Sequence, residues 1–390
     1  MFARWLRLVL GEISSLTTPN HHYFTIDFLT HTAINPSIIP HPIHPSTWII
    51  TAQLHTNRTT TSSSNHESNS VWFAELVCNA QFQSQGRVLR CTEPPFILPI
   101  AATPPDNALC TGDLAFFAMS IGPHDARVFY GPDAPYTIYG SNSALTCFGQ
   151  WILDFRVLVE WPATDVIIDH GFRYATELHR PLLSPYLAVE KNWFVFWDLD
   201  ARPYIHYDIS PTRQFAAVGV DGSTGQDLSP ASAISDTKCL QKYLPVLMNP
   251  SHESIHQATN SLSVTLCSRS DPLCRPTAEN TVVMTIFQHK SFVGFHSVYE
   301  PYVMLFWQRA PFEVYGVSRK PVWIRGRGVE VDGEEEGGNK TEMLYVTSIA
   351  WKEAGLKYHG FLDDVVFLAF GREDRDTGAI SNLIPQSLII

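Results

Sequence analysis

The sequence has few charged residues and no concentration of positive ones. Asp, Glu, Lys and Arg make up only 17% of the 390 residues, and the formal net charge is −11. A nucleic-acid-binding surface needs a basic patch or stripe, and no run of Lys or Arg supplies one here. Nucleic acid is therefore excluded as a partner.

Several motifs that identify catalytic or cofactor sites are also missing. The chain has no G-x-S-x-G elbow, no phosphate-binding P-loop and no G-x-G-x-x-G after a strand. None of the seven cysteines forms a C-x-x-C pair. His252 and His256, in His-Glu-Ser-Ile-His, have metal-ligand spacing but no convincing third ligand. We therefore expect neither a metal nor a cofactor.

No hydrophobic run reaches the length that a membrane-spanning helix needs. The first ten residues are basic and apolar, but they are too short and interrupted for a signal peptide or a span. Either the protein is soluble and intracellular, or an upstream anchor is missing from the sequence. Cys267 and Cys274 could close a disulfide across a turn, which favours the secretory pathway, Golgi or extracellular space over the cytoplasm. The odd number of cysteines leaves at least one thiol free.

Helical periodicity is scarce, and strand-like segments recur instead. Short β-branched or aromatic runs alternate with turns rich in Pro, Gly, Asn or Asp. Many short strands of this kind are typical of an all-β sandwich, barrel or propeller. The runs are Thr47–Gln53, Val71–Val77, Ala115–Ile121, Ala126–Tyr130, Tyr136–Tyr139, Gln150–Val159, Trp193–Trp197, Tyr204–Ile209, Leu262–Leu266, Thr281–Phe287, Tyr302–Phe306 and Val365–Phe370.

The segments between these runs are mostly polar. One helical turn is expected at Ser251–Thr259, where a serine can act as N-cap. No shift in composition divides the chain, so we expect one large β domain over residues 31–390, preceded by an N-terminal extension over residues 1–30. Three surface loops are expected, at Asn57–Ser70, Gly222–Ser235 and Gly333–Asn339.

A single carboxylate stands at the start of one of these runs. Asp125 follows a Gly-Pro turn and precedes Arg127 by two residues. An acid at the mouth of a strand beside a cation can act as a catalytic proton donor or acceptor, or it can form a structural ion pair. Taken alone, this spacing favours the ion pair.

Basic residues bracket a later strand. Arg173 and Lys191 could hold a phosphate, arginine as a fork and lysine as a point charge. The alternative is that the cations of this segment are loop residues neutralised by Glu177 and Glu190. The local pattern alone favours the second interpretation.

Two further polar clusters follow. His256 lies among uncharged polar residues, where it could contact a substrate or an anion, although a lone histidine is more often structural. Asp363 and Asp364 precede a strand-like run; adjacent acids can bind sugar hydroxyls or can cap the turn before the strand. Neither cluster decides a function by itself.

The order of the clusters resembles that of five-bladed β-propeller carbohydrate enzymes, most closely the β-mannoside phosphorylases and hydrolases of glycoside hydrolase family 130. That family carries Glu-Asp-Pro-Arg, Lys-Asn-Trp, a histidine loop, and a last Asp-Asp before an apolar strand and a glycine. A group of uncharacterised fungal proteins has a similar ending. The matching residues, spread from about 31 to 380, are Asn35–Ile39, His124–Arg127, Arg173, Lys191–Trp193, His256, Asp363, Asp364, Gly371 and Asp374.

The resemblance implies an all-β, five-bladed β-propeller that cleaves glycosidic bonds of an oligosaccharide or glycan, β-mannosides in particular. Asp125 would be the general acid. Inorganic phosphate would be a possible co-substrate, bound by Arg173, Lys191 and His256. The residues implied to contact the sugar are Asn35, Arg127, Asn192, Asp363 and Asp364.

One acid beside a basic pocket suits phosphorolysis. Hydrolysis with inversion needs a second carboxylate to activate water, whereas phosphate is already anionic and needs only cations that hold it in line. Glu177, Glu190 or Glu253 could replace cations in a hydrolase. His124 and Ala126 stand where the family has Glu and Pro. The alternatives are a β-mannosyltransferase-like glycosyltransferase and a non-catalytic glycan-binding propeller.

Overall fold

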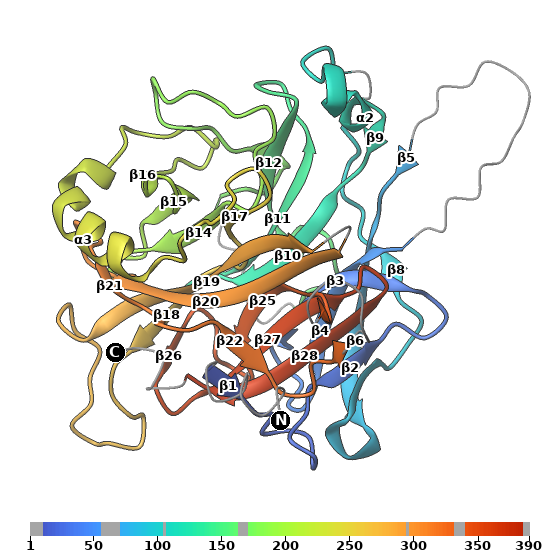
Figure 1. Ribbon diagram of the computed structural model, residues 1–390. Helices are drawn as coiled ribbons and strands as arrows, with labels where there is room; N and C mark the ends of the chain where they lie inside the picture. The colour runs from blue at the N-terminus through green and yellow to red at the C-terminus, as the bar shows by residue number, and fades with distance from the viewer. Residues whose placement is uncertain are drawn as a thin grey trace, which may run out of the picture.

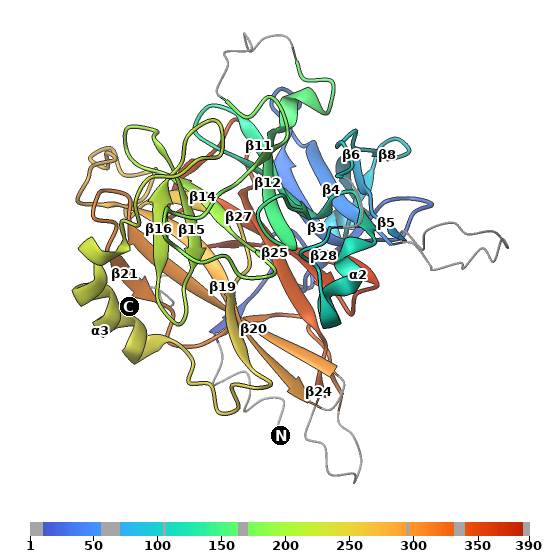
Figure 2. The ribbon, with the colours of Figure 1, turned by 90° about the horizontal axis from the view of Figure 1, so that it is seen from above.

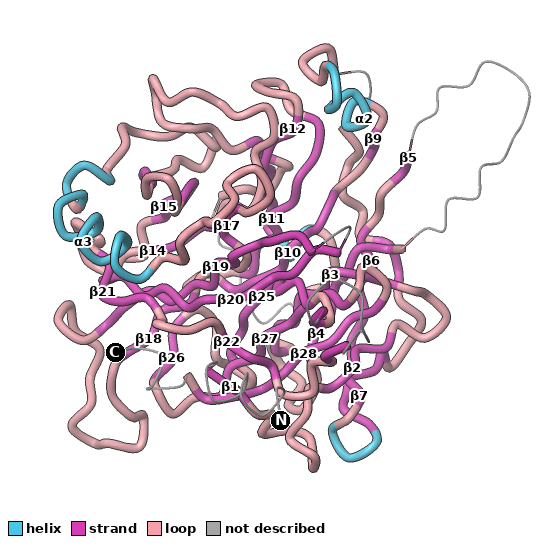
Figure 3. The backbone as a smooth tube through the Cα atoms, viewed as in Figure 1, coloured by secondary structure: helices cyan, strands magenta, loops and turns pink. Residues whose placement is uncertain are grey.

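The computed structural model describes residues 11–55, 71–103, 107–162, 171–293, 296–330 and 340–384. The loops expected at Asn57–Ser70 and Gly333–Asn339 lie outside the described residues. The described part is dominated by strands, as Figure 3 shows, and its short helices lie at the periphery.

The strands form five consecutive antiparallel sheets, called blades 1 to 5 (Figures 1 and 2). Blade 1 contains β3 (Ala33–Pro40), β4 (Trp48–Leu54), β6 (Glu75–Gln83), β7 (Val88–Cys91) and β8 (Phe96–Ile97). Blade 2 contains β10 (His124–Tyr130), β11 (Pro135–Asn142), β12 (Phe148–Asp154) and β13 (Thr176–Glu177). Blade 3 contains β14 (Phe194–Trp197), β15 (Pro203–Asp208) and β16 (Gln214–Ala217).

Blade 4 contains the two longest described strands, β19 (Thr281–Val293) and β20 (His296–Trp307). It also contains β17 (Ser254–Gln257), β18 (Leu262–Thr265) and β21 (Val314–Val317), with β26 (His359–Phe361) alongside β18. Blade 5 contains β25 (Leu344–Trp351), β27 (Val365–Arg372), β28 (Asp376–Leu383) and the early strand β2 (Phe24–Asp27).

The described blades form a closed ring. Five large hydrophobic clusters fill the five interfaces between successive blades: 1 with 2, 2 with 3, 3 with 4, 4 with 5, and 5 with 1. Strand alternation produces these interfaces, because successive side chains point to opposite faces of a sheet. On β14, Phe194 and Phe196 pack toward blade 4, whereas Val195 and Trp197 pack toward blade 2. The fold is a five-bladed β-propeller.

The ring is closed by strands from both ends of the described chain. β2 pairs antiparallel with β28 and parallel with β7, so it joins blade 5 to blade 1. Figure 1 shows the blue β2 beside the red β28. β1 (Gly11–Ile13) pairs with β22 (Val322–Ile324). The segment 11–30, which the sequence analysis assigned to an extension, therefore belongs to the propeller.

Most expected strands are present, with four local differences. The run Gln150–Val159 was expected to be one strand, but β12 ends at Asp154 and Phe155–Val157 form a 3₁₀ turn. Ala115–Ile121 was expected to be a strand but contains the short helix α2 (Ala115–Ala118) before β9 (Ser120–Ile121), which pairs with β5 (Val71–Trp72). Ser251–Thr259 was expected to be helical, but it carries β17 because its backbone pairs with β19. Helix α3 (Ala233–Tyr243) begins inside an expected loop. A minor sheet pairs β23 (Val329–Glu330) with β24 (Lys340–Thr341).

Three disulfides link the described cysteines: Cys78–Cys91, Cys110–Cys147 and Cys267–Cys274. The last of these confirms the pair expected from the sequence, and Cys239 is the free thiol. Three disulfides are typical of a protein that folds in an oxidising environment. In the described ranges, no helix combines the length and the apolar character needed to cross a bilayer.

Candidate functional site

Polar residues from all five blades gather at one end of the ring. A narrow pocket there is lined in part by Asp125, Arg127, Lys191 and Asn192. Hydrogen bonds, ring contacts and electrostatic interactions connect these residues to neighbours on the other blades. The group is Asn35 of blade 1, Asp125 and Arg127 of blade 2, Lys191 and Asn192 before blade 3, His256, Lys290 and Tyr299 of blade 4, and Tyr345 and Asp374 of blade 5.

Asp125 is half-buried at a bulge in β10, where its backbone φ is 52°. Side chains of blade 1 hold this bulge. Asn35 Nδ2 donates to Asp125 Oδ1 over 2.7 Å, and the Asp125 N–H donates to Gln53 Oε1 over 2.9 Å. The next N–H, of Ala126, donates to Glu75 Oε1 over 3.1 Å. The acid is thus oriented by the neighbouring blade.

Arg127 does not pair with Asp125. The guanidinium is 4% exposed, and its Nη2 donates to Asn192 Oδ1 and, over 3.4 Å, to the Tyr345 hydroxyl. The Tyr345 hydroxyl also donates to Asn192 Oδ1, over 3.2 Å. The structural ion pair that the spacing favoured is therefore not formed. Within the described residues, Asp125 Oδ2 is left without a hydrogen-bond partner.

Lys191 projects toward Asp125 from the loop before β14. Its ammonium lies 5.1 Å from the ring centroids of both Phe117 and Phe148. Burial of the ammonium lowers its pKa, the Asp125 charge opposes this, and Arg127 adds to it. Lys191 therefore combines a positive charge with an incomplete hydration shell, which strengthens its attraction for an anion.

Blade 4 adds an imidazole, an ammonium and a phenol. His256 Nδ1 lies 3.1 Å from the Gln257 carbonyl, so Nδ1 carries the proton and Nε2 offers a lone pair. Burial first, and then the charges of Lys290, Arg127 and Lys191, lower the pKa of His256 to about 4. Tyr299 packs against the Tyr345 ring at 5.0 Å, and Lys290 lies over Tyr299 at 5.5 Å.

Asp374 is a second carboxylate at this end of the ring. It lies on the hairpin between β27 and β28, with a backbone φ of 47°. Burial, and then the charges of Asp125 and Glu373, raise its pKa, whereas Lys290 and His55 oppose the rise. On the same hairpin, Gly371 leaves room for the Asn35 side chain, because a Cβ there would lie 2.4 Å from Asn35 Oδ1.

Three expected site residues lie elsewhere. Arg173 is exposed on the loop before β13, the outermost strand of blade 2. Asp364 pairs with Arg269 over 2.6 Å, and Asp363 accepts hydrogen bonds from the Ser268–Ser270 turn. Both acids precede β27, whereas Asp374 follows it; an eight-residue strand separates the two ends by roughly 25 Å. Asp363 and Asp364 therefore lie in the turn before the strand, which was the second of the two possibilities considered for these acids.

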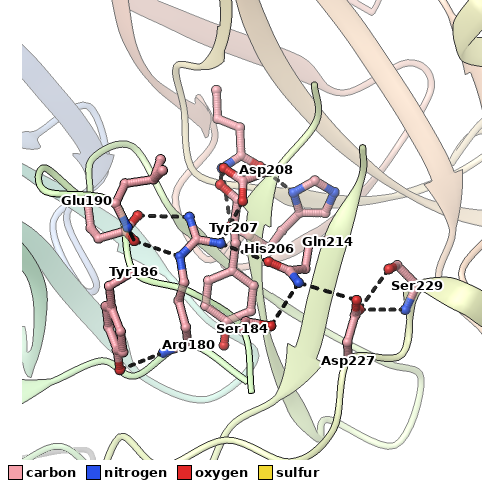
Figure 4. Close-up of polar contacts among 12 residues, drawn as sticks. Arg180, Ser184, Tyr186, Glu190, His206, Tyr207, Asp208, Gln214, Asp227 and Ser229 are labelled. Carbon is pink, nitrogen blue, oxygen red and sulfur yellow. Dashed lines mark hydrogen bonds and ion pairs between the residues drawn. The ribbon is translucent and has the colours of Figure 1, made fainter. Parts of the chain in front are cut away.

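Beneath the site, a buried polar network fixes the loop that carries Lys191 and Asn192 (Figure 4). The Arg180 fork bonds both oxygens of Glu190, over 2.6 and 2.9 Å, and its Nη1 bonds Asp208 over 2.7 Å. Nη1 also reaches Gln214 at 2.8 Å. Because Glu190 directly precedes Lys191, this ion pair anchors the cation of the site. Arg180 is thus a loop cation neutralised by Glu190, as the second interpretation of this segment expected.

His289 clamps the three strands that carry His256, Lys290 and Tyr299. Its Nε2 lies 3.1 Å from Glu253 Oε2, and its Nδ1 lies 3.2 Å from Glu300 Oε2. An imidazole between two carboxylates uses both N–H groups only when protonated. The hydrogen bond to Glu300 raises the pKa of His289, burial opposes this, and Glu253 adds to the rise.

A pH-dependent stability follows from this clamp. Since the folded state raises the His289 pKa, the stabilisation is complete below the unfolded pKa of about 6.5 and is lost as pH rises through the folded pKa. We expect His289→Gln to cost about 1 kcal/mol of unfolding free energy at pH 5 and much less at pH 9. Denaturant melts across this range check it, with the exposed His252→Gln as control. An equal loss at both pH values would contradict the clamp.

Comparisons with known proteins give similarities at the level of solved structures only. No protein-family model matches the chain, and no curated protein matches it. A β-1,2-mannobiose phosphorylase from Listeria innocua, in complex with β-1,2-mannobiose, matches with a TM-score of 0.47 and 10% identity over 96% of each chain. A mannose phosphorylase from Leishmania mexicana, in complex with a phosphate ion, matches with a TM-score of 0.43 and 10% identity over 93% of this chain and 87% of that one. The catalytic domain of a GH62 α-L-arabinofuranosidase from Coprinopsis cinerea matches with a TM-score of 0.41 and 8% identity over 95% and 98%.

Proposed function

We propose that the protein cleaves glycosidic bonds of an oligosaccharide or glycan, β-mannosides first among them, with Asp125 as general acid. The observation that carries the proposal is the environment of this carboxyl group. Asn35 anchors Asp125 Oδ1. Among the described residues, Asp125 forms no ion pair and Oδ2 accepts no hydrogen bond. A positioned carboxyl with one unengaged oxygen is what proton transfer to a leaving group requires.

The cations around Asp125 favour an anionic nucleophile. Lys191 and Lys290 would attract inorganic phosphate, and Arg127, already bonded to Asn192, would add positive charge below it. His256 Nε2, which carries a lone pair, would accept the remaining proton of a hydrogen phosphate. These contacts would hold the nucleophile near the anomeric carbon without a general base.

The proposed reaction is a single displacement. An oxygen of phosphate forms a bond to the anomeric carbon while the glycosidic C–O bond breaks. The proton on Asp125 Oδ2 goes to the departing sugar oxygen. The products are a sugar 1-phosphate and a shortened sugar, and solvent returns a proton to Asp125. Asn35 and Asn192, with the amides of their side chains at the pocket, would contact sugar hydroxyls.

Hydrolysis is the second candidate, and Asp374 is the observation that favours it. A carboxylate at the same end of the ring as Asp125 could take a proton from an attacking water molecule. Water would then replace phosphate as the nucleophile, and free sugar would replace the sugar 1-phosphate. The two reactions differ only in their products and in their need for phosphate.

Product analysis with and without phosphate tests the proposal. Purified protein is incubated with β-linked mannobioses, and mannose 1-phosphate and free mannose are quantified. Phosphate-dependent mannose 1-phosphate supports phosphorolysis; free mannose without phosphate supports hydrolysis. Turnover only with a nucleotide-sugar donor would assign a glycosyltransferase, and glycan binding without any product would assign a non-catalytic propeller.

The anion site has its own test within this assay. For phosphorolysis, Lys191→Met is expected to raise the KM for phosphate about tenfold, because it removes one charge-assisted contact of about 1.5 kcal/mol. Lys238→Met, on the exposed face of α3, is the matched control and should leave the KM unchanged. An unchanged KM in Lys191→Met would remove this lysine from the phosphate site.

A further inference from the structure

A buried carboxyl group stands directly behind the candidate acid. Glu75, on β6, is fully inaccessible to solvent. Its Oε1 accepts the Ala126 N–H, and in the described part of the chain its Oε2 has no hydrogen-bond partner. No ion pair within the described residues involves Glu75. A charged carboxylate would be very costly in such a place, because neither water nor a cation compensates it.

The groups that face Glu75 also disfavour a negative charge. On β10, Asp125 is like-charged, and His124 packs its ring at 3.7 Å on Phe73 with its pKa lowered to about 4 by burial, so it carries no charge at neutral pH. On β4, the paired Gln53 is uncharged. β8 contributes no charged group: it pairs with β6 through its backbone, and the N–H of Leu98, which follows it, donates to the Glu75 carbonyl. Burial first, and then the Asp125 charge, raise the pKa of Glu75 well above its usual value, although the Ala126 N–H opposes this.

We propose that Glu75 is a positioning residue of Asp125, and that it acts as a neutral, proton-bearing acceptor for the Ala126 N–H. The inference rests on the proposed function of Asp125. Glu75 and Gln53 accept two consecutive N–H groups at the bulge of β10, so blade 1 fixes the turn that points the Asp125 side chain into the pocket. Ionisation of Glu75 would place a buried negative charge directly behind Asp125.

This arrangement gives Ala126 a specific role. Its N–H is the donor that Glu75 binds, and its side chain is fully buried in the interface between blades 1 and 2. A residue without an N–H, such as proline, could not form this contact. The hydrogen bond from Ala126 to Glu75 thus holds Asp125 in place across the interface between blades 1 and 2. Its acceptor, the Glu75 carboxyl group, can lose its proton at high pH.

Two substitutions at Glu75 separate the roles of shape and proton. Glu75→Gln keeps an oxygen acceptor for the Ala126 N–H and cannot ionise, whereas Glu75→Leu keeps the approximate volume and removes the acceptor. We expect Glu75→Gln to retain kcat within about twofold at neutral pH, and to remove only the part of the alkaline fall in kcat that ionisation of Glu75 adds to ionisation of Asp125. Glu75→Leu is expected to lower kcat about 10²-fold with a smaller change in KM, since the acid is misplaced.

A readout independent of turnover keeps this inference separate from the proposed function. The infrared difference between the wild type and Glu75→Gln at neutral pH should contain the carbonyl band of one protonated carboxyl group, that of Glu75. Thermal melts should show the same proton: a raised folded pKa gives stability that is complete at low pH and lost as pH rises, so Glu75→Gln should flatten the alkaline decline of Tm.

The outcomes divide cleanly. The neutral Glu75 is overturned if this difference band is missing, or if Tm declines with rising pH as steeply in Glu75→Gln as in the wild type. If the band is present but Glu75→Leu turns over as well as the wild type, the positioning role is wrong. If Asp125→Asn retains full activity, the proposed function fails, and the positioning role fails with it, while the infrared band and the melts still decide the protonation of Glu75.

Discussion

Asp125→Asn is expected to lower kcat for a β-mannoside by about 10²- to 10⁴-fold, the usual contribution of a general acid. The substitution keeps the shape of the side chain, and the amide oxygen can still accept the Asn35 hydrogen bond. The fold and the KM should therefore change little. Initial rates with a poor leaving group measure the effect, since such a substrate depends most on proton donation.

The same change at Asp364 is a sharp control. Asp364 pairs with Arg269 and lies at the far end of blade 5 from the pocket. We therefore expect Asp364→Asn to turn over like the wild type, apart from a small loss of stability. If Asp364→Asn lost activity and Asp125→Asn kept it, the site would lie at the other end of the ring.

Arg180→Met is expected to lower the unfolding free energy by about 3–5 kcal/mol, because it leaves the buried Glu190 carboxylate without its partner. The Arg180 and Glu190 side chains are 4% and 2% exposed, so water cannot compensate the charge. The loop that carries Lys191 should also shift, which would raise the KM for phosphate if phosphorolysis is correct. Denaturant unfolding measures the first effect.

Two comparisons show whether burial is the cause. Arg202 pairs with Asp198 and Asp200 at the surface, where its side chain is 69% exposed, so Arg202→Met should cost less than about 1 kcal/mol. Adding Glu190→Gln to Arg180→Met removes the stranded charge and should restore part of the lost stability. Equal losses in Arg180→Met and Arg202→Met would mean that the buried pair contributes nothing special.

The strands could be predicted because their pattern is unambiguous. In segments such as Phe194–Trp197, both faces meet another blade, so apolar residues run without interruption and turn residues mark the ends. α2 and β17 could not be predicted in this way. Their short segments carry no periodicity, and pairing with distant strands decides the structure of β17.

The candidate site was partly predictable from the sequence. Asn35, Asp125, Lys191 and His256 lie near strand starts, where short polar motifs interrupt apolar runs, and the structure brings them together with Arg127 and Asn192. The sequence gives no such signal for Tyr345, Tyr299 or Lys290, whose patterns match ordinary strand residues.

Asp363 and Asp364 show a second limit. Acids before and after β27 look alike in sequence, yet they lie at opposite ends of a blade. The direction of β27 in the ring decides which of its two ends faces the pocket. No local sequence pattern gives this direction. Glu75, in contrast, can be noticed in the sequence, because it directly precedes the apolar run Leu76–Cys78. An acid at the start of such a buried strand is itself at risk of burial, and a buried acid seldom occurs without a specific reason.

The closure of the ring by β2 and β28 also sets the order of events during synthesis. The candidate site draws one or more residues from every blade, and blade 5 is complete only when its last strand, near the end of the described chain, has met the early strand β2. Until then, the interface between blades 5 and 1 is not formed, because contacts so distant in sequence form late and slowly. The pocket therefore assembles in a single late step, and a nascent chain that stops short of β28 would carry most of the site residues without a site.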